Sequence, residues 1–283
     1  MNVQDGLSDL LYLMRRLRNR DGGCPWDIEQ TFESIAPHTL EEAYEVVDCI
    51  ERGDFDHLRE ELGDLLFQVV YHSQMASEEE RFTFSDVVET LVAKLIARHP
   101  HVFPGGDLFA ERGSDNTPAD AVGTEWVRGR WEERKAEERA SKKHADNSAL
   151  ADIPVALPGL SRLQKVQKRA SRAGFPSRGS DEILRDIAAH AAWLSQSLSE
   201  GGAITEAQIG ALLFDCADLA HVEKADAERA SRRVGREFEQ LFRALEASLE
   251  ARGESMETLS PEKKEQYLAQ LKQLLKKKNS WDL

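Results

Sequence analysis

Cysteine is scarce in this sequence of 283 residues, which has three, Cys24, Cys49 and Cys216. They form no C-x-x-C pair and have no zinc-binding spacing, and three thiols are a poor number for a disulfide framework, so a reducing cytoplasm is the expected location. Long apolar runs are missing too. No segment reaches the length of about 18 residues that a membrane-spanning helix needs, and the N-terminus lacks the basic start and apolar run of an export signal, so we expect no membrane partner.

Positive charge is in deficit. The sequence has 37 Lys and Arg against 51 Asp and Glu, a formal net charge of −14. No global field therefore draws the protein to nucleic acid or to an anionic membrane surface, and we expect no nucleic-acid partner. A negatively charged small molecule would have to arrive with a metal ion or meet a local basic cluster.

The alternation of Val and Ile that marks half-buried strands is also absent, while Leu, Ala and Val recur at helical spacing. This pattern predicts an all-α protein. Four helices are expected early in the chain, with the glycine- and proline-containing stretch RDGGCPWDIEQT as a loop between the first two. Short connections make neighbouring helices antiparallel. The expected helices are about 5–19, 39–52, 54–79 and 85–99.

A second group of four helices follows in the same order. Between the groups, Gly, Asp, Pro and Ser dominate and one charged helix is expected, which is typical of a linker. We therefore predict three parts: residues 1–104, a linker 105–157, and residues 158–283. The later helices are expected at about 159–173, 181–199, 204–222 and 226–251, with a lysine-rich helix after Pro261.

The two groups repeat a phrase with its acids removed. The stretch EELGDLLFQVV at 60–70 returns as AQIGALLFDCA at 207–217, so Gln208 and Ala211 replace Glu61 and Asp64 while the apolar skeleton is kept. Aligning DIAAHAAW (186–193) with TLEEAYEV (39–46) shows a second set of losses. There Ala188, Ala189 and Ala192 replace Glu41, Glu42 and Glu45. Acids that vanish together from a retained skeleton indicate a metal site lost as a unit.

The remaining acids pair at helical spacing. Glu42 and Glu45, and likewise Glu61 and Asp64, stand at i, i+3 and so share a helix face beside the apolar seam. Two charges about 4 Å apart repel by roughly 4 kcal/mol at an effective dielectric near 20, so a cation is required. Oxygen-only ligands favour Mg²⁺, with Mn²⁺ as a substitute, and Mg²⁺ sites commonly include substrate phosphates. A phosphorylated substrate is implied.

Other readings of these residues remain open. Thr39 and Glu42 fit a capping box at a helix start, and the acids of 60–64 fit a solvated stripe. In the second group a polar set is either a relocated site or surface polarity, and the latter is the simpler reading. Its members are Asp215, Asp218, His221 and Glu223.

The phrases EEAYE and ELGD match the E-E-x-x-E and E-x-x-D pattern of the MazG family of nucleoside triphosphate pyrophosphohydrolases. The stretches GCPWDIEQTFESIAPHTLEEAYEV, ELGDLLFQVVYHSQMA and RHPHVF resemble that family's N-terminal domain, and IPVALPGLSRLQKVQKRA resembles the start of its second domain. The resemblance covers nearly the whole chain. It implies tandem four-helix units that dimerise, and Mg²⁺-dependent hydrolysis of nucleoside triphosphates to monophosphate and pyrophosphate.

Carried over by position, the resemblance makes Glu42, Glu45, Glu61 and Asp64 the metal ligands, with Glu41 as an additional base or outer acid. The family can carry the acidic set in both domains; here the second lacks it, so activity is expected in the first. A nucleotide-binding or regulatory protein without catalysis is the alternative, and a helical adaptor is a third. Candidates for substrate contact are Lys94 and Arg98 for phosphate, Trp26 for stacking on a base or anchoring its loop, and His38 for phosphate or a turn.

Overall fold

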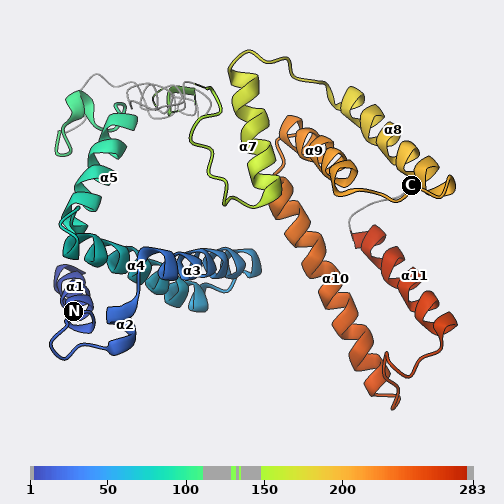
Figure 1. The fold of residues 1–283 in the computed structure, drawn as a ribbon, viewed down its shortest axis with the longest axis horizontal. Coiled ribbons are helices and arrows are strands. Elements are labelled where there is room, and N and C mark those ends of the chain that lie inside the picture. Colours follow the sequence, from blue (N-terminus) through green and yellow to red (C-terminus); the bar gives the residue numbers. More distant parts are fainter. Residues whose placement is uncertain (1–2, 111–128, 132–133, 135–147, 279–283) are drawn as a thin grey trace. The chain divides into compact units, whose positions relative to one another are not determined.

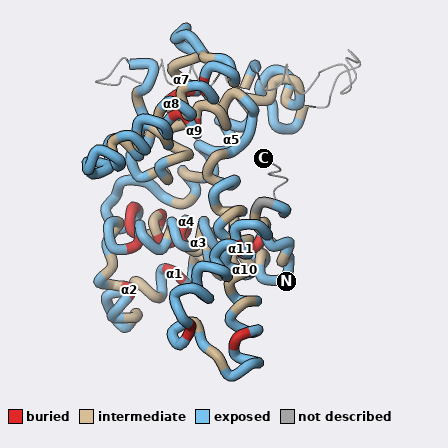
Figure 2. Tube along the Cα trace, turned by 90° about the vertical axis from the view of Figure 1, so that its right-hand side faces the viewer, coloured by how far each residue is buried: buried red, intermediate tan, exposed pale blue. Residues whose placement is uncertain are grey.

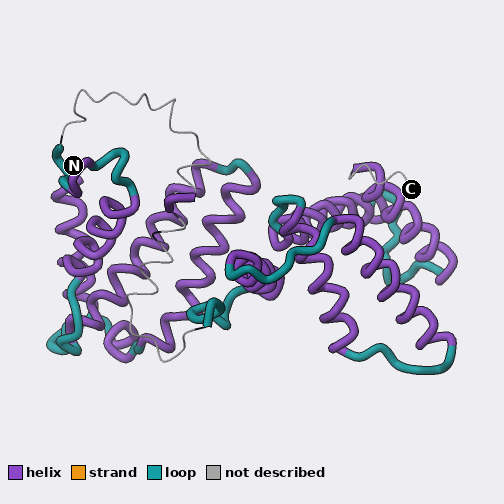
Figure 3. Tube along the Cα trace, turned by 90° about the horizontal axis from the view of Figure 1, so that it is seen from above, coloured by secondary structure: helices purple, strands orange, loops and turns teal. Residues whose placement is uncertain are grey.

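The computed structural model describes residues 3–110, 129–131, 134 and 148–278. In these residues the regular elements are helices and no strand is present, which confirms the all-α prediction (Figures 1 and 3). The chain divides into two compact units, Met1–Lys143 and His144–Leu283. Their boundary falls inside the stretch expected as a linker, and most of the charged helix expected there lies outside the described residues.

The first unit is organised around the pairing of two long helices. α3 packs along α4, and α1 and α5 each pack against α4 as well. Figure 1 shows these helices in blue and blue-green. The bounds are α1 Val3–Leu17, α2 Pro25–Glu29, α3 Phe32–Arg52, α4 Phe55–Glu78 and α5 Phe84–Arg98, followed by a short 3₁₀ turn at Pro104–Gly106.

Side chains at the helix ends fix the connection between α3 and α4. Gly53 follows α3 with φ 73°, a left-handed conformation that glycine adopts without strain. Asp54 then caps α4 by accepting from the His57 backbone N–H at 3.2 Å. Both features confirm the sequence-based prediction. The turn reverses the chain immediately, so α3 and α4 run antiparallel.

The expected starts of two helices were wrong, and one short helix was missed. α3 begins at Phe32 rather than near Thr39, because Thr31 and Ser34 form a reciprocal capping box. Pro37 lies inside this helix and cannot donate the intrahelical bond to the carbonyl of Glu33, which is exposed in the first turn. α5 likewise begins after Thr83, capped with Asp86, and not at Ser85. The segment expected as a loop contains α2.

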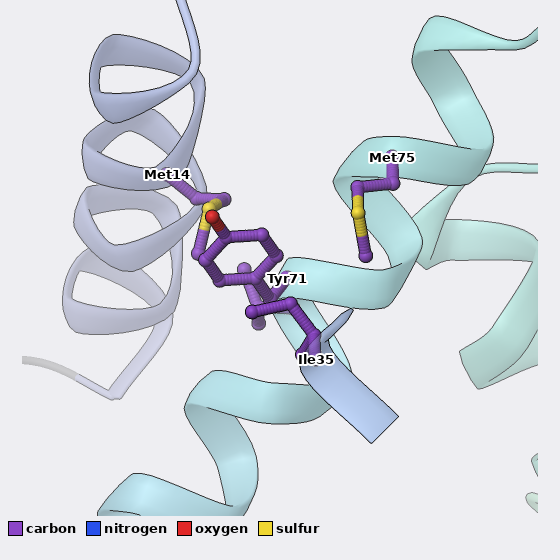
Figure 4. Packing of buried hydrophobic residues seen from close by; sticks show 5 residues of the cluster. Met14, Ile35, Tyr71 and Met75 are labelled. Atoms are coloured by element: carbon purple, nitrogen blue, oxygen red, sulfur yellow. The ribbon is translucent and has the colours of Figure 1, made fainter. Parts of the chain in front are cut away.

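The core of the first unit joins α1, α3 and α4. Met14 of α1, Ile35 of α3 and Tyr71 and Met75 of α4 are each no more than 3 % exposed, together with Val70. Figure 4 shows Met14 and Ile35 converging on the Tyr71 ring. This core lies toward the C-terminal half of α4, and it fixes the helix pair whose other end carries the acids.

Arg18 ties the N-terminal segments to this core. Its guanidinium pairs with Glu78 at 2.7 Å, lies over the Tyr71 ring at 5.5 Å, and donates to the backbone carbonyls of Asp27 and Gln30. The Tyr71 hydroxyl donates to the same Asp27 carbonyl at 2.9 Å. Arg18 therefore has a structural role here, as the link between α1, α2 and α4.

The second unit contains the five later helices at the predicted places. α9 packs on α7 and α8, and α10 packs on α7, α9 and α11. Buried residues are few, and Figure 2 marks them as short red segments. No described helix is both long and apolar enough to cross a membrane. The bounds are α7 Gly159–Arg172, α8 Ser180–Ser199, α9 Glu206–Val222, α10 Ala227–Glu250 and α11 Pro261–Lys278.

Replacing Arg18 by Met should destabilise the first unit by about 2–4 kcal/mol, because the change removes the cation paired with the partly buried Glu78 carboxylate and one donor from each of the Asp27 and Gln30 carbonyls. Urea denaturation followed by circular dichroism measures this. Arg15→Met, at an exposed position of the same helix, is the control and should cost less than about 0.5 kcal/mol. Equal effects of the two substitutions would contradict the structural role of Arg18.

Candidate metal centre

The antiparallel pairing of α3 and α4 brings acids from both helices together. One carboxylate oxygen from each of Glu42, Glu45 and Glu61 lies within 4.8 Å of the other two. Asp64, the fourth predicted ligand, is exposed on α4 and acts electrostatically on Glu42. We call these four residues the acidic cluster. Acids of both i, i+3 pairs therefore meet across the helix interface, Glu42 and Glu45 from α3 and Glu61 from α4.

Burial and mutual repulsion raise the pKa of two members of the acidic cluster, Glu42 and Glu61. Partial burial raises the pKa of Glu42, as do the charges of Asp64, Glu45 and Glu61. Desolvation and the neighbouring Glu45 and Asp64 also raise the pKa of Glu61. Both shifts mean that the ionised carboxylates are held together at a cost in free energy, which a bound cation would offset.

A buried amide adjoins the acidic cluster. Gln68 lies on α4 one turn beyond Asp64 and is 6 % exposed. Its Nε2 donates to Glu42 Oε1 at 3.4 Å. The burial of this residue and its contact with Glu42 were not predicted from the sequence. The available signal was a polar side chain at i+4 from Asp64 within the otherwise apolar run LLFQVV.

Glu41 lies outside the acidic cluster. It is exposed, and His38 lies beside it, with Nδ1 at 3.4 Å from the Glu41 carboxylate. The other histidine near this interface, His72, contacts the Thr39 hydroxyl at 3.0 Å and stacks on Phe32. His38 and Glu41 thus form an exposed pair just before Glu42 in α3.

The structure contradicts the helix-start reading of Glu42. Thr39 is an interior residue of α3 whose hydroxyl contacts Ile35 O and His72, whereas the capping box of this helix lies at Thr31 and Ser34. Of the acids in the solvated-stripe reading, Glu60 and Asp64 are exposed and Glu61 is half-buried, so that reading stays open for the first two.

Three residues expected to contact phosphate or a base lie outside α3 and α4, namely Lys94, Arg98 and Trp26. Lys94 is exposed on α5, and Arg98 near the end of that helix lies over the Trp131 ring at 5.1 Å. Trp26 is 55 % exposed, so it is not the buried anchor of its loop. The anchor is the Asp27 carbonyl bound by Arg18 and Tyr71.

The second unit replaces the acidic cluster by an internal ion-pair network. Arg178 pairs with Asp215 and Asp218 through Nη2 and with Asp186 through Nη1, each at 2.8 Å. His190 Nδ1 lies 2.8 Å from the second Asp215 oxygen. Asp215 is 3 % exposed, so reading it as surface polarity was wrong. A relocated metal site is also disfavoured, because an arginine already supplies the positive charge between these acids.

The lost positions have become ordinary helix residues. Ala189, Ala192 and Ala211 offer no ligand, and Gln208 accepts from the Thr205 backbone N–H at 2.8 Å in the capping box of α9. In the described part of the second unit, no group of three potential ligands matches the one in the first.

A family model and two known proteins are similar in sequence to this chain. A family model described as the MazG nucleotide pyrophosphohydrolase domain matches residues 30–103, a stretch that includes the acidic cluster. A nucleoside triphosphate pyrophosphohydrolase of Escherichia coli is 45% identical, over 93% of this chain and 95% of that protein. The nucleoside triphosphate pyrophosphohydrolase/pyrophosphatase MazG of Thermotoga maritima is 34% identical, over 92% of each chain.

The raised pKa values of Glu42 and Glu61 predict a pH-dependent response to metal. In metal-free buffer the folded state binds more protons than the unfolded state above the ordinary carboxyl pKa. The free energy of unfolding should therefore fall as pH rises through the raised pKa values. A divalent cation binds the deprotonated carboxylates and should restore it. Thermal melting at about pH 5 and pH 7.5 should show the larger Mg²⁺-induced stabilisation at the higher pH. Equal stabilisation at both would contradict metal binding by the acidic cluster.

Proposed function

Because the chain belongs to the MazG family of nucleotide pyrophosphohydrolases, we propose that it is a hydrolase that converts nucleoside triphosphates to monophosphates and pyrophosphate, with its active site in the first unit. The convergence of Glu42, Glu45 and Glu61 from two antiparallel helices carries this proposal. The acidic cluster repels a triphosphate, so the two are compatible only through a shared cation.

We propose Mg²⁺, with Mn²⁺ as a substitute, as the cation of the acidic cluster. The residues fit this choice, because the donors are carboxylate oxygens, with no Cys or His within the described group of ligands. Glu42, Glu45, Glu61 and Asp64 are the proposed ligands. The raised pKa values of Glu42 and Glu61 indicate that these two would gain most from a bound cation.

In this proposal the chain's own residues hold the cation, supply an outer acid or base, and bind the substrate. A divalent cation bound there would supply a nucleophilic water near neutral pH and neutralise phosphate charge. The paired glutamates of α3 and α4 hold that charge between two helices fixed by the core around Tyr71. Glu41, exposed beside His38, is the proposed outer acid or base. For the substrate, Lys94 and Arg98 are the proposed phosphate contacts, and the exposed Trp26 is a surface on which a base could stack.

A nucleotide-binding protein without catalysis is the second candidate. It draws support from the second unit, where the acidic set is absent and a structural ion-pair network has taken its place. The complete acidic cluster in the first unit argues against it, because clustered carboxylates cost stability unless a cation is bound. For the second unit, dimerisation or ligand sensing remains the proposed role.

The double substitution Glu61→Gln/Asp64→Ala gives the first unit the residue types that the second unit has at the aligned positions, Gln208 and Ala211. In the full-length protein it should abolish most pyrophosphate release from a panel of nucleoside triphosphates with Mg²⁺, because half of the proposed ligand set is removed. The matched control is Glu60→Gln, an exposed neighbour outside the acidic cluster, which should keep wild-type activity. Retained activity in the double variant would place the chemistry elsewhere. Inactivity of all three proteins would favour the binding role.

We also propose that two copies associate through the first unit. Apolar residues form an exposed stripe at helical spacing on each of three helices, on a side of α4 away from the acids. Such stripes are typical of helices that pack against a partner. The exposed residues are Leu40 and Tyr44 on α3, Leu62, Leu66 and Val69 on α4, and Val88, Leu91 and Leu95 on α5.

Leu66→Glu should convert the proposed dimer to a monomer, since it places a charge within the apolar stripe of α4. Sedimentation velocity measures the change in mass. Phe109→Glu introduces the same charge at a residue that is 88 % exposed outside the stripes, and it should leave the mass unchanged. A monomeric wild-type protein would contradict self-association.

A further inference from the structure

Gln68 is the polar side chain of α4 that continues the acidic cluster into the helix interface. Glu61, Asp64 and Gln68 stand at i, i+3 and i+7, so they share the face of α4 that meets α3. Gln68 is 6 % exposed, and its Nε2 reaches Glu42 Oε1 at 3.4 Å. The amide therefore lies at the buried end of the cluster, where it contacts one of the proposed ligands directly.

The other end of this amide is unexplained by the fold. Its carbonyl oxygen Oε1 is buried and has no hydrogen-bond partner among the described residues. A buried acceptor without a donor is costly, and apolar side chains would normally fill such a position in a helix interface. A donor from the hydration shell of a bound cation would satisfy this acceptor.

We infer that Gln68 is a positioning residue for divalent-cation binding. Its amide N–H holds the Glu42 carboxylate facing the other acids of the cluster, and its carbonyl accepts a hydrogen bond from the hydration shell that Mg²⁺ keeps in protein sites. The inference rests on the proposed function, because it concerns the same acidic cluster. It adds a residue outside the ligand set that controls how well the set binds a cation.

The second unit offers an independent comparison. In the alignment that puts Ala189 on Glu42 and Ala211 on Asp64, Asp215 takes the place of Gln68. Asp215 is equally buried, but its carboxylate pairs with Arg178 and His190 instead of reaching a ligand. Where the acids are absent, this position has been turned to a different partner. The amide occurs only in the unit whose neighbouring residue is a carboxylate that needs orientation.

The experiment measures Mn²⁺ binding to the full-length protein, by the loss of the free Mn²⁺ resonance signal and by thermal stabilisation without nucleotide. Gln68→Met, which keeps the length but removes both polar groups, should weaken Mn²⁺ affinity roughly 10-fold, as loss of a hydrogen bond to a metal ligand typically does. The metal-free melting temperature should stay the same or rise, because a buried acceptor is removed. Raising the Mn²⁺ concentration should restore the stabilisation.

The matched control is Gln74→Met. Gln74 also lies on α4 and also donates to a glutamate, Glu78, at 2.9 Å, but that glutamate is outside the acidic cluster. Its loss should leave Mn²⁺ affinity unchanged. If Gln68→Met fails to fold, Gln68→Asn retains a polar amide that is one methylene too short to reach Glu42, and it should show the same loss of affinity.

The outcomes distinguish the proposed metal site from the positioning role of Gln68. Failure of the wild-type protein to bind Mn²⁺ would overturn the proposed metal site. Tight binding by the wild type together with an affinity for Gln68→Met within about twofold of it would overturn the positioning role alone. Equal losses in Gln68→Met and Gln74→Met would assign the effect to the helix in general and would also overturn the inference.

Discussion

Repulsion between carboxylates across the α3–α4 interface is the constraint on which the first unit depends. The Gly53–Asp54 turn makes the two helices antiparallel, and the core around Tyr71 fixes their separation. The backbone positions of Glu42 and Glu61 are therefore held close together. Burial and the charges of the neighbouring acids raise the pKa of both carboxylates. A site built in this way is preorganised for a cation, because the cost of assembling the ligands is met by folding.

The second unit pairs its helices in the same way but balances the charge internally. Arg178 enters from the segment before α8 and neutralises carboxylates on α8 and α9. An arginine supplies a permanent charge and five donors, so no diffusible ion is required. Its pKa is raised by the hydrogen bonds to Asp215, so the guanidinium stays ionised. The α3–α4 pair gathers carboxylates that could bind a cation, whereas the α8–α9 pair has its carboxylates neutralised by Arg178.

Much of this could be predicted from the sequence, and the failures have physical causes. Helical spacing placed both groups of helices, and the i, i+3 acids were found because a helix face is a local property. The start of α3 was misplaced because Thr39 and Glu42 also fit a capping box, whereas the reciprocal cap that begins the helix lies at Thr31 and Ser34. Gln68 and Arg178 were missed because their roles depend on contacts between helices. A buried glutamine and an arginine in a loop carry no local signal of a distant carboxylate.

The polar contacts along the α3–α4 interface form a graded series. At one end the carboxylates of Glu45 and Glu61 meet, and at the other His72 contacts Thr39, with burial lowering the pKa of His72. Gln68 lies between these pairs and contacts Glu42. The interface therefore changes from charged and partly solvated to neutral and buried within a few turns. A neutral amide at the transition can bond a carboxylate without adding charge where water no longer screens it. An additional acid at this position would extend the repulsion into the core, and an apolar residue would remove the amide donor that reaches Glu42.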